Sequence, residues 1–327
     1  MNSGNKTRTV ARAEFGSVPN RALRVPKPTT VGRGKLVWTY AVALAVMHAL
    51  VFLAFVPWLF SWAGVAALVL GILVFGEGII LGYHRLLAHN SFAVPKWLEY
   101  TLATLAMCSL HDTPIRWVTA HRMHHKYSDH QNDPHTPLAG WAWGHALWLM
   151  YANSGTRNPI AYGAFAHDLL RDRFYRKLEK HPWLPIVIFF AHAYAYFGVG
   201  FLLGWAVSGT AMGGVQLGAS LVVWGVILRT VATWHITWSV NSFVHLYGYR
   251  TYNTRDNSRN NWILAIVASG EGWHHNHHHD PASASNQHKW WELDPSFAVV
   301  WCLEKVGLAT NVIRPRCRRH AARAAAE

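Results

Sequence analysis

The sequence predicts an all-α integral membrane protein, in which four transmembrane helices carry a cytoplasmic helical cap with a histidine-rich metal site. The membrane class follows from residues 36–76 and 183–228, two runs of 41 and 46 residues without Asp, Glu, Lys or Arg. A bilayer core about 30 Å thick needs roughly 20 apolar helical residues, so each run accommodates two spans and a tight turn. The metal site follows from 22 histidines, which outnumber the 16 acidic residues.

The four spans are expected near residues 37–60, 63–83, 183–207 and 214–233. Tight turns are expected around residues 57–62 and 208–213. A further apolar stretch, residues 98–110, is only 13 residues long. It is too short to cross the bilayer, so we expect an interfacial or buried helix there.

The charges that flank the spans predict their orientation. Residues 1–35 contain eight Lys or Arg and one Glu, and residues 313–327 contain five Arg and one Glu. The positive-inside bias predicts that both termini lie on the cytoplasmic side. We therefore expect a basic N-terminal arm (1–35), a membrane domain (36–312) and a basic C-terminal tail (313–327). The arm has no early apolar core, so a cleaved signal peptide is not expected.

The composition argues against several other classes. The net charge of +14 would suit nucleic-acid binding, but cytoplasmic basic flanks explain it and no RNA- or DNA-binding module is visible. The three cysteines are widely spaced and odd in number, which excludes a disulfide framework, a Cys zinc cluster and a Cys-held iron–sulfur cluster. Any metal is therefore expected to have nitrogen or oxygen ligands.

Nine histidines and one asparagine form ordered clusters. On a helix, residues at i, i+3 and i+4 share a face, so the histidines within each of the two HxxHH boxes can point at one place. The clusters are His84 with His89, His121 with His124 and His125, Asn241 with His245, and His274 with His277 and His278. Neutral imidazole binds iron, copper, nickel and zinc, and this number of ligands exceeds what one tetrahedral zinc takes. The clusters therefore predict a dinuclear site.

His84 and His89 do not fit one regular helix. Five residues at about 100° each leave the two side chains roughly 140° apart. Either the helix breaks between them, or they serve different metal ions.

At these clusters the chain resembles the membrane fatty acid desaturases of the stearoyl-CoA, Δ9 type. The resemblance covers about residues 37–312 and rests on an ordered set of segments with matching intervals. These segments are HRLLAH followed by NSF and PKWLEY, PIRWVTAHRMHHKYSDHQNDPH, TWSVNSFVHLYGYR, and GEGWHHNHHH followed by KWWELD. The resemblance implies a fatty acid desaturase domain over 36–312, with two non-haem iron ions at the cytoplasmic ends of the spans. The ligands that it implies are His84, His89, His121, His124, His125, Asn241, His245, His274, His277 and His278, with Asn241 acting through a water.

The resemblance also implies a bent acyl tunnel beside the irons, at Trp117, Thr237 and Trp238; ordinary aromatic packing at the membrane interface is the alternative. His111 stands where the family usually has Gln. It could change the chain or the double-bond position that is selected, or simply replace the hydrogen bond of Gln. His275 and His279 also depart from the family pattern, and we expect His275 to lie behind the ligands rather than among them.

Several acidic residues and one further histidine are expected to orient the ligands. Asp129, Asp133, His135 and Glu271 flank the boxes and match the family. Glu77 lies inside the second span, where an ionisable side chain is costly and often functional. It could hydrogen-bond a ligand imidazole, or simply pair with another interior group.

The leading hypothesis is an O₂-dependent desaturase that introduces a cis double bond, at Δ9, into a saturated acyl chain. The alternative is a hydroxylase of the same histidine-rich superfamily. A metal transporter would line its spans with ligands, whereas here the histidines gather at span ends. No haem-, flavin- or cluster-binding segment is visible, so electrons are expected from a separate cytochrome b5 or ferredoxin. The acyl carrier, CoA or lipid, is left open, and basic residues such as Arg116 and Arg122 could meet its phosphates or form a solvated face.

Overall fold

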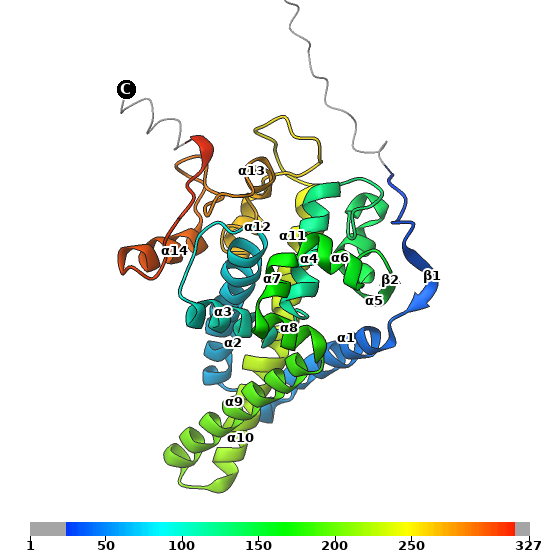
Figure 1. The fold of residues 1–327 in the computed structure, drawn as a ribbon. Coiled ribbons are helices and arrows are strands. Elements are labelled where there is room, and N and C mark those ends of the chain that lie inside the picture. The colour runs from blue at the N-terminus through cyan, green and yellow to red at the C-terminus, as the bar shows by residue number, and fades with distance from the viewer. Residues whose placement is uncertain (1–23, 318–327) are drawn as a thin grey trace, which may run out of the picture.

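The structure is a computed structural model that describes residues 24–317, and its fold is almost entirely helical (Figure 1). The first half runs β1 (Val31–Leu36), α1 (Trp38–Leu50), η1 (Val51–Phe55), η2 (Pro57–Leu59), α2 (Trp62–Glu77), η3 (Gly78–Ala88), α3 (Lys96–Met107), α4 (Pro114–Tyr127), η4 (Pro137–Ala139), η5 (Trp143–Leu147), α5 (Trp148–Met150) and β2 (Tyr151–Asn153). The second half runs α6 (Pro159–Phe165), α7 (His167–Arg171), α8 (Arg173–Lys180), α9 (Leu184–Ser208), α10 (Ala211–Val222), η6 (Val223–Leu228), α11 (Arg229–Ser242), η7 (Phe243–His245), α12 (Trp262–Val267), α13 (His274–His279) and α14 (Pro295–Lys305).

Four continuous helical segments are long and apolar enough to cross a membrane, which confirms the predicted fold class. They are Trp38–Phe55, Trp62–Ala88, Leu184–Ser208 and Ala211–His245. The second and fourth extend beyond the predicted ends at residues 83 and 233. Both extensions carry histidines of the predicted metal site, so the spans themselves deliver these ligands beyond the apolar core.

The third and fourth spans form a hairpin that protrudes from the rest of the molecule (Figure 1). Gly209 turns the chain with φ 67°, and the Thr210 hydroxyl caps α10 by accepting the Gly213 N–H. α9 and α10 lie so close that a Cβ on Gly200 would be 2.7 Å from the Gly218 Cα. Small residues thus permit the close backbone approach that packs helices in lipid.

The 13-residue apolar stretch forms α3, which packs along the second span. A Cβ on Gly78 would lie 2.6 Å from the Ala106 nitrogen, so the two helices are in backbone contact. The inner face of α3, including Ala103 and Met107, is fully buried, while Trp97 on its outer face is exposed. The sequence allowed an interfacial or a buried helix here, and α3 is buried on its inner face only.

The short sheet pairs the two strands β1 and β2 antiparallel. β1 occupies residues 31–36, so the last residues of the predicted arm belong to the folded body; their backbone is fixed by pairing with β2. Residues 313–317 of the predicted tail also contact the body, since Ile313 donates its N–H to the Ser91 carbonyl. The rest of the predicted arm and tail, 1–23 and 318–327, lies outside the described residues.

Candidate metal centre

Nine imidazoles gather into two adjoining groups where α4, α13 and the ends of the second and fourth spans meet. Within each group, one ring nitrogen of every histidine lies within 4.8 Å of those of all the others. The first group consists of His84, His89, His121, His125 and His277, and the second of His124, His245, His274 and His278. All nine are histidines that the sequence predicted as ligands.

The second span reaches the first group by changing its helical winding. From Gly78 to Ala88 the chain is a π-helix, in which the His89 N–H donates to the His84 carbonyl at 3.1 Å. Hydrogen bonds between residues five apart bring such residues onto one side of the helix. A regular α-helix would need a break between His84 and His89, or two separate metal ions, to use both side chains as ligands. The π-helix instead brings both into one group.

The two HxxHH boxes divide their histidines between the groups in a reciprocal way. On α4, His121 and His125 belong to the first group and His124 to the second. On α13 the i, i+4 pair, His274 and His278, belongs to the second group, and the i+3 residue His277 belongs to the first.

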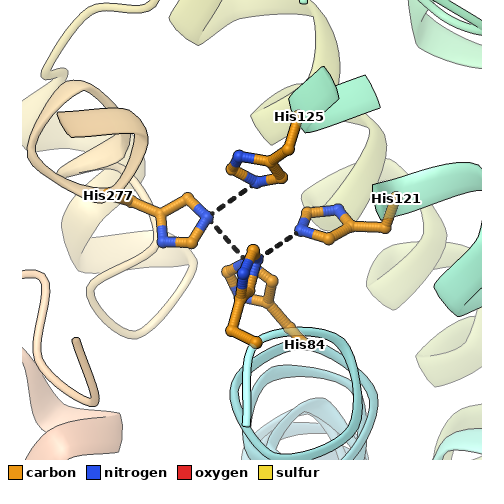
Figure 2. A group of neighbouring side chains, drawn as sticks. His84, His121, His125 and His277 are labelled. Carbon is orange, nitrogen blue, oxygen red and sulfur yellow. Dashed lines mark hydrogen bonds between the residues drawn. The ribbon is translucent and has the colours of Figure 1, made fainter. Parts of the chain in front are cut away.

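The expectation that each box points at one place is therefore too simple. At about 100° per residue, positions i+3 and i+4 lie on either side of position i, and two adjacent centres can share one box. Figure 2 shows His121 and His125 from α4, His277 from α13 and His84 from the second span converging.

Carboxylates hold the outer nitrogen of four of the nine rings. The Nδ1 atoms of His84 and His245 lie 2.8 Å from Glu271 and Asp129 respectively. Nδ1 of His124 lies 2.9 Å from Asp133, and Nδ1 of His278 lies 3.3 Å from Asp256. Such contacts fix the ring orientation and leave Nε2 as a lone-pair donor. The other predicted neighbour, His135, stacks on His124 with ring centroids 4.4 Å apart.

A buried ion network holds Glu271 in place. Arg85 donates to one oxygen of Glu271 and to both oxygens of Asp294. Burial alone would raise the pKa of Glu271, but the contacts with His84 and Arg85 lower it to about 2. Glu77 lies apart from the imidazoles: its carboxylate accepts the Ser296 hydroxyl at 2.8 Å, which is the interior pairing that the sequence allowed as the alternative.

The geometry of both groups suits a cation. Burial, and then the neighbouring imidazoles, lower the pKa of His121, His125 and His277 well below the usual value, so these rings are neutral. The Nε2 atoms of His84 and His277 face each other at 3.1 Å. In the second group, the Nε2 atoms of His274 and His245 face each other at 3.1 Å, and the buried Nε2 of His278 has no hydrogen-bond partner. Buried lone pairs that converge in this way need a positive partner, which an N-ligated transition metal supplies.

Of the predicted substrate residues, Trp117 contacts this centre, whereas Thr237 and Trp238 lie further back on α11. Trp117 stacks on His121, with ring centroids 4.9 Å apart, and Trp238 is buried against Trp234. The Thr237 hydroxyl donates to the Thr233 carbonyl of its own helix, and Asn241 lies one turn before His245.

His111 is buried in the loop between α3 and α4, and its Nε2 has no hydrogen-bond partner. Burial, and then the charge of Arg229, lower the pKa of His111 to about 3, so its ring is neutral. The flanking residues Leu110 and Asp112 both have positive φ, 52° and 66°. Tyr83 donates its hydroxyl to the Asp112 carbonyl, and Trp234 its indole N–H to the Ser109 carbonyl. His111 is thus held by side chains from two spans.

Sequence reasoning missed Asp256, Arg85 and Asp294. Asp256 lies in the polar stretch 251–261, which reads only as a loop, and neither spacing nor composition marks it as a partner of His278. Arg85 stands next to His84 inside the first box, so its position was visible, but its partners lie almost 200 residues away and only the fold brings them together.

The fold and the site together define a class: a helical integral membrane protein whose spans end in an imidazole-lined centre able to hold metal. The family model for fatty acid desaturase matches residues 59–302.

Named relatives match over most of their length. The chain is 41% identical over 281 residues to the sn-2 palmitoyl-lipid 9-desaturase of Nostoc sp. (strain 36), covering 85% of this chain and 91% of that one. It is 39% identical to the Delta-9 acyl-lipid desaturase 2 of Arabidopsis thaliana (82% and 80% covered). It is 37% identical to the acyl-CoA 5-desaturase AL21 of Anemone leveillei (79% and 74% covered). The chain belongs to the fatty acid desaturase family and is an oxidoreductase acting on fatty acyl chains.

Proposed function

We propose that the protein is an O₂-dependent acyl desaturase that introduces a cis double bond at Δ9 into a saturated fatty acyl chain. The observation that carries this proposal is the pair of adjoining imidazole groups at the ends of two membrane spans. Relatives named as 9-desaturases of acyl lipids support the reaction and the position.

Two non-haem iron ions are proposed as the cofactor, one in each group. The donors are imidazoles with no cysteine among them, a set that suits iron. His84, His89, His121, His125 and His277 would hold one ion; His124, His245, His274 and His278 would hold the other, with Asn241 contributing through a water. When bound, reduced iron supplies the O₂ activation that removing hydrogen from an unactivated methylene requires.

Besides the acyl chain and O₂, the desaturation reaction needs an electron carrier. Two hydrogens leave adjacent methylenes, one O₂ is reduced to two waters, and an external carrier supplies two electrons while solvent supplies two protons. We propose cytochrome b5 or ferredoxin, with its reductase, as that carrier.

The protein's own residues orient the ligands and exclude water. Glu271, Asp129 and Asp133 each hold a ring nitrogen at 2.8 or 2.9 Å, so that the opposite nitrogen stays directed inward. Trp117 covers His84 and His121 with apolar surface, and Trp238 packs against Trp234 on α11. We propose that Trp117 and Trp238, with Thr237 and His111, line the acyl chain and fix which carbons lie beside the centre.

The chain is an integral membrane protein, and we propose that both termini and the metal centre face the cytoplasm. The basic segments at both ends support this orientation. A hydroxylase with the same centre is the alternative, because an identical oxidant could leave an alcohol in place of a double bond.

Expression in a host that makes no unsaturated fatty acids tests the function. Lipid analysis with double-bond location should find new Δ9 monoenes with the chain and none with the His121→Ala and His277→Ala variants. Hydroxylated chains without monoenes would favour the hydroxylase, and an active protein with zinc and no iron would contradict both.

A further inference from the structure

A hollow between α6 and α8 lies immediately before the third span. Its volume is about 670 Å³, and its wall combines Pro159, Tyr162 and Leu170 with residues from Arg173 to His181. Only residues 181–183 separate α8 from α9, which crosses the membrane. The hollow therefore lies at the bilayer surface, on the side proposed as cytoplasmic.

The sequence of α8 builds a cationic stripe along this hollow. Arg173, Arg176, Lys177 and Lys180 are exposed, and their spacing of i, i+3, i+4 and i+7 places them on one helix face. On the other side of the helix, Tyr175 and Leu178 are buried in the core. The four cations are thus held at the rim by the packing of the opposite face.

No carboxylate within the described part of the chain neutralises this stripe. None of its four cations lies within 4.0 Å of an acidic side chain, whereas Arg116 and Arg122 pair with Glu179 and Asp168. Glu179, the acidic residue in the wall, accepts hydrogen bonds from Arg116 and the Thr113 hydroxyl. The positive potential at the rim is therefore available to an external anion.

The hollow suits an amphiphile better than a fully soluble anion. Pro159, Leu170 and the buried Tyr162 give the wall an apolar part next to the cationic rim. Cations next to a membrane attract anionic lipids. A lipid head group would place its charge on α8 and its glycerol and chains towards the bilayer.

The wall of the hollow is connected to the metal centre through α4. Glu179 binds Thr113, the N-cap residue of α4, and Arg116 in its first turn. His121 follows Thr113 by eight residues, or about 12 Å along the helix axis. The wall of the hollow and the first histidine of α4 are therefore about two helical turns apart.

We infer that this hollow binds the anionic head group of a membrane glycerolipid, which makes the substrate an acyl lipid. The inference rests on the proposed desaturation and names its substrate class. The uncompensated cations on one face of α8 carry it.

Direct binding to the full-length protein in neutral detergent tests the inference. The probes are short-chain phosphatidylglycerol, short-chain phosphatidylcholine, CoA and inorganic phosphate. Arg176→Gln/Lys180→Gln should weaken phosphatidylglycerol binding at least tenfold. The matched double variant Arg255→Gln/Lys305→Gln, which removes two exposed charges elsewhere, should leave it unchanged.

Equal phosphatidylglycerol binding by both double variants would overturn the inference. So would binding of CoA as tight as that of phosphatidylglycerol, which would indicate a thioester site, or equally tight binding of inorganic phosphate, which would indicate a simple anion site. Because these measurements need no turnover, they stand apart from the lipid analysis that tests desaturation. If phosphatidylglycerol binds at α8 but no monoenes form in the expression host, the proposed desaturation is contradicted and the lipid site is not.

Discussion

The Glu271 carboxylate lies 2.8 Å from Nδ1 of His84, and its other oxygen accepts the Arg85 guanidinium at 2.7 Å. All three side chains are buried, so the carboxylate is held by charge on one side and holds the ligand ring on the other. Contacts of this kind fix which nitrogen of a ligand imidazole faces the metal.

Replacing Glu271 should therefore weaken the first group. Glu271→Gln removes the negative charge that orients His84 and leaves Arg85 with Asp294 alone. We expect iron affinity to fall by about 10- to 100-fold. Iron content after dialysis against a chelator measures this, and Glu304→Gln, at a half-buried pair with Arg314, is the control. Unchanged iron retention in Glu271→Gln would show that the contact does not support metal binding.

The second group should respond to its own carboxylate. Asp129 holds Nδ1 of His245, and it also accepts the Asn257 N–H and the Thr136 hydroxyl. Asp129→Asn should release iron from the second group and leave the first loaded, so that about half of the iron remains. Combining it with Glu271→Gln should remove nearly all of it. Loss of all iron from either single variant would mean that the two groups act as one site.

The proposed acyl path predicts a contrast at Thr237. Thr237→Val keeps the shape and loses only a hydroxyl that bonds within α11, so activity should stay within about twofold. Thr237→Trp should fill the path and lower activity more than tenfold with iron content unchanged. Measuring products and iron content together distinguishes a blocked acyl path from a lost metal. An active Thr237→Trp variant with unaltered products would place the acyl chain elsewhere.

Glu292 should contribute strongly to stability. It is fully buried and accepts hydrogen bonds from the Tyr249 hydroxyl, the Asn276 amide and the N–H groups of His288 and Lys289. Glu292→Ala leaves these donors unpaired and should cost about 3 kcal/mol or more. Thermal unfolding in detergent should show a clear drop relative to Glu304→Ala, and equal midpoints would contradict this role.

Much of the fold was predictable because membrane spans leave a strong signal in a single sequence. The uncharged runs predicted four spans, and residues 24–317 contain four helical segments long and apolar enough to cross a membrane. The spans' extensions to Ala88 and His245 were less visible, because they mix histidine and other polar residues with apolar ones. The pairing of residues 31–36 with Tyr151–Asn153 depends on contacts far apart in the chain, which local pattern does not encode.

The candidate ligands could be predicted, but their arrangement could not. Spacing identified the histidines, whereas the π-helix at 78–88 and the sharing of each HxxHH box between two groups depend on how four helices meet. Glu271 and Asp129 were expected to orient ligands, but only the fold shows that they hold His84 and His245. Nothing in the local sequence around Asp256 distinguishes this partner of His278 from a loop residue. Their roles as ligands and orienting groups remain predictions that metal analysis decides.

The central claim is that the two imidazole groups each hold one iron. Iron analysis of the purified chain, with His89→Ala in the first group and His274→Ala in the second, tests it most directly. We expect two irons per chain in the unaltered protein and about one in each single variant, while His279→Ala, outside both groups, keeps two. A single iron in the unaltered protein, or a full complement in both variants, would contradict the account.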